Sequence, residues 1–134
     1  MINIPSYQGH GTPTKGATSH AGLWFDRFYG GYQQNWSIDN TDPDAKRKWI
    51  DTVTGDSVGD PTHLDAHTRT TLKRVAALQG QCEAYSSDWR WVTGTGNPHP
   101  VENGFSWHPT LGVPYLSGAS VKGLVRAWVE EGDD

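Results

Sequence analysis

Ser117, Gly118, Ser120, Lys122 and Arg126 form the pattern in this sequence that is best suited to hold an anion. A Ser-Gly turn in front of a helix leaves N–H groups of the first helical turn without partners, and such groups bind phosphate oxygens. Lys122 and Arg126 lie four residues apart, so both cations would project from one side of that helix. The pattern predicts a phosphate site. Its structural alternative is a capped helix with two ordinary surface cations.

A loop rich in Gly, Pro and His precedes this turn and covers residues 94–110. A loop of this length inside a small domain is usually functional or disordered. Trp107 and His108, with His99 earlier in the loop, could stack on a nucleic-acid base. Alternatively, Trp107 anchors the loop to the core and the histidines are hydrated. We therefore take Trp107 and His108 as candidate RNA contacts beside the turn.

Three further groups of residues are weaker candidates for chemistry. The cationic run Lys46–Lys48 fits the hydrated face of a helix better than a phosphate site. His63 and His67 have the i, i+4 spacing of metal ligands, but the further ligands of a zinc pattern are missing, so we predict no metal. Asp26 has no partner acid or base at a catalytic spacing, and with Arg27 it is more simply a structural pair. Without a nucleophile triad either, we predict no catalytic residue and no cofactor.

The composition describes one small domain with many turns. The 134 residues are 34% hydrophobic, with 16 Gly and 8 Pro. The formal net charge is −4, but four of the 15 acids lie at positions 130–134, and the other 11 (15 − 4) balance the 11 bases. A neutral body binds RNA tightly at physiological salt only with help from partner subunits. One cysteine excludes an internal disulfide, and no membrane or signal pattern is present, which fits a cytoplasmic protein.

The elements that would position the candidate residues mix helices and strands. Residues 1–20 are polar and aperiodic and are predicted to be a flexible arm. Helices are expected from Asp42-Pro43-Asp44 to about Val53, from Asp60 to a C-cap at Gly80, and from about Ser120 to Glu131. Alternating residue types predict a hairpin or bent strand at 81–93 and a short strand at 111–116.

Apolar residues are arranged to form a core in this scheme. The cluster from Leu23 to Tyr29 fits either a short helix or an irregular anchor. In the first expected helix, Ala45, Trp49 and Ile50 turn inward. Apolar residues fall on one face of the second expected helix: Leu64, Leu72, Val75 and Leu78. The third expected helix has a stripe that is predicted to be buried: Val121, Leu124, Val125, Trp128 and Val129.

The segment His108–Trp128, HPTLGVPYLSGASVKGLVRAW, resembles the signature of the RAMP superfamily of CRISPR proteins. In that signature a strand ends in a Pro-Gly-Ser-Ser-like turn, followed by Leu/Ile-Lys-Gly and an arginine one turn later. Position 117 is serine rather than proline and position 119 is alanine rather than serine, and the matching residues are Gly118, Ser120, Lys122, Gly123 and Arg126. Segments 91–116 and 22–32 resemble the sixth subunit of the type III-B Cmr complex.

The resemblance implies an α+β, ferredoxin-like fold, similar to an RNA-recognition motif, with helical insertions and long loops over residues 21–134. The chain carries only the first half of the family pattern, so we expect a partial sheet that pairs with another chain. The resemblance further implies a non-catalytic subunit that binds guide RNA paired with target RNA, contacts other Cmr subunits, and caps or extends their filament. Two alternatives stay open: a shortened homologue that acts as a decoy or inhibitor, and a metal-dependent ribonuclease.

Overall fold

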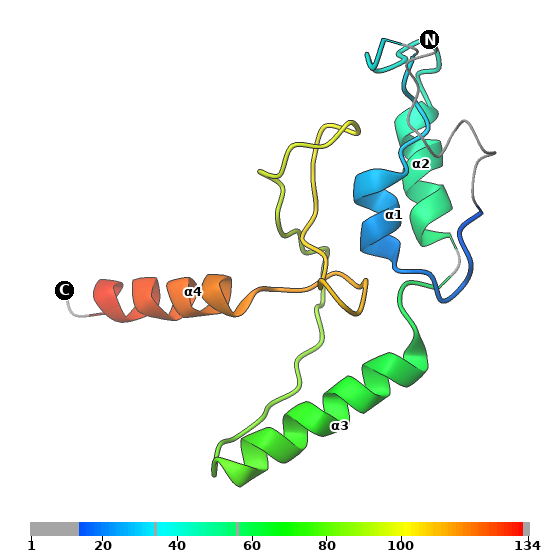
Figure 1. The fold of residues 1–134 in the computed structure, drawn as a ribbon. Coiled ribbons are helices and arrows are strands. Elements are labelled where there is room, and N and C mark those ends of the chain that lie inside the picture. The colour runs from blue at the N-terminus through cyan, green and yellow to red at the C-terminus, as the bar shows by residue number, and fades with distance from the viewer. Residues whose placement is uncertain (1–13, 34, 56, 133–134) are drawn as a thin grey trace.

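The computed structural model describes residues 14–33, 35–55 and 57–132. Within these ranges the chain forms four helices, α1 (Ala21–Arg27), α2 (Ala45–Thr54), α3 (Pro61–Ala77) and α4 (Gly118–Glu131), joined by turns and irregular segments (Figure 1). The described residues make only isolated β-bridges, between Tyr32 and Ile38 and between Trp107 and Pro114. The described chain is therefore all-helical and has no sheet.

The predicted α+β ferredoxin-like fold is wrong for the described residues. Segments 81–93 and 111–116, predicted as strands, form no ladder. Isolated backbone hydrogen bonds join the segments instead. The Ser106 N–H donates to the Thr93 carbonyl at 3.0 Å, and the Tyr115 N–H donates to the Ser106 carbonyl at 3.2 Å. Strands need repeated bonds from a neighbour, and residue alternation does not supply that neighbour. The strand edge expected to pair with another chain is likewise absent from this part of the molecule.

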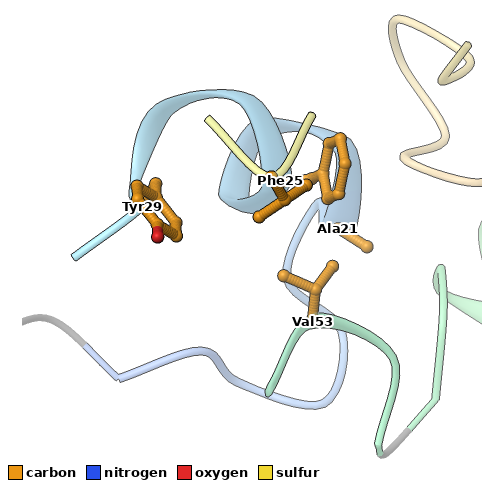
Figure 2. Packing of buried hydrophobic residues seen from close by; sticks show 5 residues of the cluster. Ala21, Phe25, Tyr29 and Val53 are labelled. Atoms are coloured by element: carbon orange, nitrogen blue, oxygen red, sulfur yellow. The ribbon is translucent and has the colours of Figure 1, made fainter. Parts of the chain in front are cut away.

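α1 and α2 pack on each other around a small hydrophobic core (Figure 2). Ala21 and Phe25 come from α1, Val53 from α2, Tyr29 from the chain after α1, and Val101 from the long loop. The first apolar cluster is thus a short helix followed by an anchoring residue. The core brings three separate segments together, residues 21–29, α2 and the long loop, and it positions the loop that leads to α4.

His20 fixes the start of α1 against the turn before α4. Its Nδ1 accepts the Leu23 N–H at 2.9 Å, and its Nε2 lies 3.0 Å from the Pro109 carbonyl oxygen. Gly112 has φ +64°, and a side chain there would start 2.8 Å from the Cα of His20. Glycine is therefore required at this turn for both backbone angle and space.

The predicted flexible arm at 1–20 falls partly outside the described residues, which begin at 14. Three hydrogen bonds tie the described end of this segment to other parts of the chain, one of them from the Lys15 ammonium group to the Ser57 carbonyl at 3.4 Å. The Ser57 hydroxyl donates to the Ala17 carbonyl at 2.8 Å, and His20 contacts Pro109 as above. Residues 17–20 thus pack against the body of the protein.

The predicted bounds of α2 and α3 are close to those in the structure. α2 begins after Asp44 and ends at Thr54. α3 begins at Pro61 behind Asp60, whose side chain accepts the N–H groups of Thr62 and His63 at 2.8 and 3.4 Å. The start of α3 therefore confirms the prediction from its Asp-Pro signal, whereas α2 begins two residues after Pro43 and its N-cap Asp44 makes no side-chain capping bond.

The ends of the helices differ slightly from the predictions. The left-handed residue after α3 is Gln79, with φ +54°, rather than Gly80. The Gly80 N–H still donates to the Val75 carbonyl at 2.9 Å, which closes the last turn. α4 begins two residues before Ser120, because Ser117 serves as its N-cap.

The apolar faces of α3 and α4 are exposed, which contradicts the prediction that the α4 stripe is buried. Neither helix has a buried residue, and α4 extends away from α1 and α2 (Figure 1). The accessible surface is 10487 Å², against roughly 7000 Å² expected for a compact monomer of this mass. An amphipathic pattern shows that a helix face needs an apolar neighbour, but it does not show that this chain provides one. None of the described helices is long and apolar enough to cross a membrane.

Candidate nucleic-acid interface

Ser117 caps α4 and leaves the amide end of the helix open. Its backbone is extended, at φ −66° and ψ 145°. The Ser117 Oγ accepts the Ser120 N–H at 3.2 Å and lies 2.8 Å from the Ser120 hydroxyl, while its carbonyl accepts the Val121 N–H at 3.1 Å. Gly118 is exposed, and nothing lies within 4 Å of where its side chain would begin. An anion can therefore reach the first turn without moving a side chain.

Lys122 and Arg126 add exposed positive charge to the same helix. Lys122 has no carboxylate within ion-pair distance among the described residues, so its ammonium group can pair with a ligand. The Arg126 Nε donates to Glu130 Oε1 at 2.7 Å, and the two side chains are 79% and 62% exposed. An exposed pair of this kind contributes little stability, so a phosphate can compete with Glu130 for the guanidinium group. Lys122 thus lies one turn inside the open N-terminus of α4, and Arg126 lies one turn further, roughly 12 Å along the helix axis from Gly118.

Trp107 anchors the long loop rather than presenting a free stacking surface. Its ring centroid lies 5.5 Å from that of Phe25 and 5.7 Å from that of Phe105. A side chain added at Gly22 would begin 2.4 Å from the Trp107 Cβ, which shows how closely the loop and α1 approach. This geometry fits the structural alternative for Trp107, which is partly buried.

His108 organises the turn between the loop and α4. Its Nδ1 accepts the Leu111 N–H at 3.2 Å, and its backbone N–H donates to the Val113 carbonyl at 2.8 Å. Its ring lies edge-on to Tyr115 and to His67 of α3, with centroids 5.4 Å apart in each case. His108 therefore joins α3 to the turn, and its lone pair at Nδ1 is already used.

His99 is likewise held by the core. Its Nε2 lies 2.6 Å from the Phe25 carbonyl oxygen, its Nδ1 accepts the Val101 N–H at 3.1 Å, and its ring stacks on Phe25 at 4.0 Å. Because Nδ1 accepts, the proton lies on Nε2 and is donated to Phe25. His99 therefore positions the loop. Both of its ring nitrogens are bonded within the protein, which does not fit the alternative that the histidines are hydrated.

Each cation of the run Lys46–Lys48 is paired with a carboxylate. Lys46 pairs with Glu102, Arg47 with Asp44 at 3.3 Å, and Lys48 with Asp42 at 2.6 Å. The hydrogen bond and the charge of Asp42 raise the pKa of Lys48, and the same hydrogen bond lowers the pKa of Asp42. The run is therefore electrically balanced, which favours its interpretation as the outer face of α2.

The weaker candidates for metal binding and catalysis are not brought together. Within the described residues, no three His, Cys, Asp or Glu side chains cluster as metal ligands. His63 lies 3.9 Å from Asp60, whereas the ring of His67 contacts His108. Asp26 makes no ion pair with Arg27 there, so the predicted structural pair is wrong. Asp26 and Arg27 instead line a shallow cavity beside Trp107 and Pro109.

A second, apolar cavity lies between α1, α2 and the long loop, and it was not predicted. It has a volume of about 420 Å³ and is lined mainly by aliphatic and aromatic side chains, including Phe25, Ile50, Val92, Val101, Phe105 and Trp107. The residues come from segments up to about 90 positions apart, so no local pattern indicates it. Only the apolar character of the individual residues was visible in the sequence.

Comparisons with known proteins found no relative of this chain. No protein-family model, no curated protein and no solved structure matched the chain.

Proposed function

We propose that this chain is a non-catalytic, guide-RNA-binding subunit of a type III-B CRISPR effector complex. In this role it caps or extends the backbone filament in the cytoplasm and contacts the guide RNA with its paired target. The observation that carries the proposal is the exposed N-terminus of α4, with Gly118 and Ser120 in its first turn and Lys122 and Arg126 one and two turns further along the helix. These are also the residues on which the resemblance to the RAMP signature rests.

The arrangement suits an RNA backbone better than a small anion site. Its cations are exposed, and the amide end is open on the solvent side. Phosphate contacts of this kind bind without reading sequence, as a subunit that holds many different guides requires. Trp107 and His108 contribute by fixing the turn, and any contact they make with RNA is secondary.

Neighbouring subunits would supply the rest of the binding energy. Leu78, Tyr85, Trp89 and Val92 are all at least 70% exposed, and they lie at the C-cap of α3 and in the following segment. Apolar groups of this size are typical of surfaces that another protein covers. A subunit whose body is neutral apart from the four acidic residues at positions 130–134, and which exposes such a surface, is suited to act inside an assembly.

The same exposed surface supports a second candidate function, a homologue that docks into a type III complex and inhibits it. A type III-B complex that lacks its sixth subunit distinguishes the two. If this chain is the guide-binding subunit, adding it restores guide retention and target cutting. If it is an inhibitor, it binds the intact complex, and target cutting by that complex stops. A chain that does not associate at all contradicts both proposals.

A further inference from the structure

A hollow lined by aromatic rings lies next to the turn that leads into α4. It has a volume of about 410 Å³, with rings from Tyr85, Trp91 and Tyr115 and hydroxyl groups from Ser86 and Ser87. We propose that this hollow holds an unpaired base of a single-stranded RNA whose phosphates contact the N-terminus of α4. The base site rests on the proposed RNA binding and adds the place where a base of the strand lies.

Two of the three rings are held in position by other parts of the chain. The centroid of the Trp91 ring lies 6.0 Å from that of Phe105. The Tyr115 ring lies edge-on to His108, with centroids 5.4 Å apart. Backbone hydrogen bonds of Ser106, at 3.0 and 3.2 Å, join the two segments that carry these rings. The rings are therefore positioned before a ligand binds, which lowers the entropy cost of binding.

The faces of the rings are available for stacking. Among the ring contacts of the described residues, none joins Tyr85, Trp91 or Tyr115 to another of the three. Tyr85 is 91% exposed and Trp91 is 44% exposed. A base that enters the hollow gains stacking contacts, and every nucleobase offers a flat face for them. The Ser86 hydroxyl makes no hydrogen bond within the described chain, so it can bond to the edge of a base.

The charges beside the hollow favour an anionic strand. The lining itself carries no charged residue, which suits an uncharged base. Arg90 lies between lining residues, is exposed, and has no carboxylate within ion-pair distance in the part of the chain that the structure describes. The Cα atoms of Tyr115 and Gly118 are three residues apart, so at most about 11 Å separates them. A short RNA strand can therefore place a base in the hollow and a phosphate at the amide end of α4.

The base site is compatible with protein contacts in the same region. Of the exposed apolar residues assigned above to neighbouring subunits, only Tyr85 lines the hollow. Leu78, Trp89 and Val92 lie outside its lining and stay available for those subunits. His108 contributes indirectly, because it supports the Tyr115 ring.

The first test uses fluorescence anisotropy with the full chain and two labelled RNAs of about 10 nucleotides. One is a mixed-sequence single strand, and the other has the same backbone with every base removed. Trp91→Leu and Tyr85→Leu each remove a ring and keep an apolar side chain. We expect each variant to bind the single strand at least ~5-fold more weakly and the abasic strand unchanged. Trp128→Leu removes an exposed ring from α4 and is the matched control, which should change neither affinity.

The second test locates the base by photo-crosslinking. The full chain is irradiated with a single-stranded RNA that contains thiouridine, and the joined peptides are identified by mass spectrometry. We expect the RNA to be joined to residues 85–91 or 114–116. Circular dichroism of Trp91→Leu checks that the fold is retained, and Tyr85→Leu gives the same information at a residue that is almost fully exposed.

The outcomes separate the base site from RNA binding in general. A wild-type chain that binds neither strand contradicts the proposed function and the base site together. Equal affinities for the two strands, an equal loss in Trp128→Leu, or crosslinks confined to other segments would overturn the base site while RNA binding stands. Aromatic hollows also take proline-rich peptides. Binding of a labelled proline-rich peptide that is lost in Trp91→Leu, with RNA affinity unchanged, would overturn the base site as well.

Discussion

Replacing Lys122 and Arg126 with glutamine removes the two cations beside the N-terminus of α4 while keeping side chains of similar length. Neither residue takes part in the core, and α4 has no buried residue, so the fold should not change. The helix should also persist, since glutamine favours helix about as well as lysine and arginine. The double variant therefore isolates the contribution of charge at this site.

The expected loss follows from counterion release. Each phosphate neutralised on single-stranded RNA contributes about 0.7 to the slope of log affinity against log salt, so two contacts contribute about 1.4. That slope corresponds to roughly a 10-fold loss of affinity at 0.15 M salt. It also means that wild-type affinity should fall about 7-fold more than that of the variant between 50 and 200 mM salt.

Fluorescence anisotropy with a labelled single-stranded RNA of guide length measures both quantities. The matched control is Lys73→Gln with Arg74→Gln, which removes the same charge from the exposed surface of α3. This control should leave the salt slope within about 0.5 of wild type, because those cations lie away from the amide end. Equal losses in both double variants would refute the reasoning, since they would show a general effect of net charge.

Four further outcomes follow from packing and capping. Val53→Ala should lower the free energy of unfolding by about 2 kcal/mol in urea titration, because Val53 is fully buried. Gly22→Ala should lower it by about 1–3 kcal/mol, because the new Cβ would meet Trp107 at 2.4 Å. Gly123→Ala, with nothing within 4 Å, should instead increase helicity and stabilise α4 by about 0.5–1 kcal/mol. Hydrogen bonds from the Thr62 backbone lower the pKa of Asp60 below its ordinary 3.8, so its stabilisation of α3 is complete above that pH and is lost below it. Far-UV circular dichroism should show a larger loss of helix in wild type than in Asp60→Asn as pH falls below about 4.

Outcomes opposite to these would identify which part of the account is wrong. A neutral Gly22→Ala would mean that α1 and the loop do not approach closely. A destabilising Gly123→Ala would mean that another surface covers α4. Identical acid titrations of wild type and Asp60→Asn would remove Asp60 as the cap of α3.

Three of the four described helices were predictable from local chemistry, whereas α1 was left open and the absence of a sheet was not predicted. Asp60 and Pro61 start α3 through interactions within a few residues of themselves, and just before α2 the Asp42 side chain accepts the Asp44 N–H at 2.9 Å. Strands depend on partners far along the chain, so the alternation at 81–93 was a necessary sign but not a sufficient one. The resemblance to the RAMP signature extended the expectation of strands to a complete ferredoxin-like fold.

The candidate site was predictable in its residues but not in its geometry. Ser117 is the cap, three positions before the expected helix start at Ser120. The packing of Trp107 and the hydrogen bonds of His108 come from contacts with α1 and α3, which spacing does not encode. The ion pair of Arg126 with Glu130 follows an i, i+4 spacing that was readable in the sequence.

The RNA that accompanies the chain in cells tests the proposed function most directly. The tagged full-length protein is isolated from its native cells under mild salt, and the RNA that co-purifies is sequenced beside an untagged control. We predict short guide RNAs carrying CRISPR-repeat sequence, together with other subunits of a type III complex, and their loss from the Lys122→Gln, Arg126→Gln chain. Recovery of no RNA above the control, or only of abundant cellular RNA, would contradict the proposal.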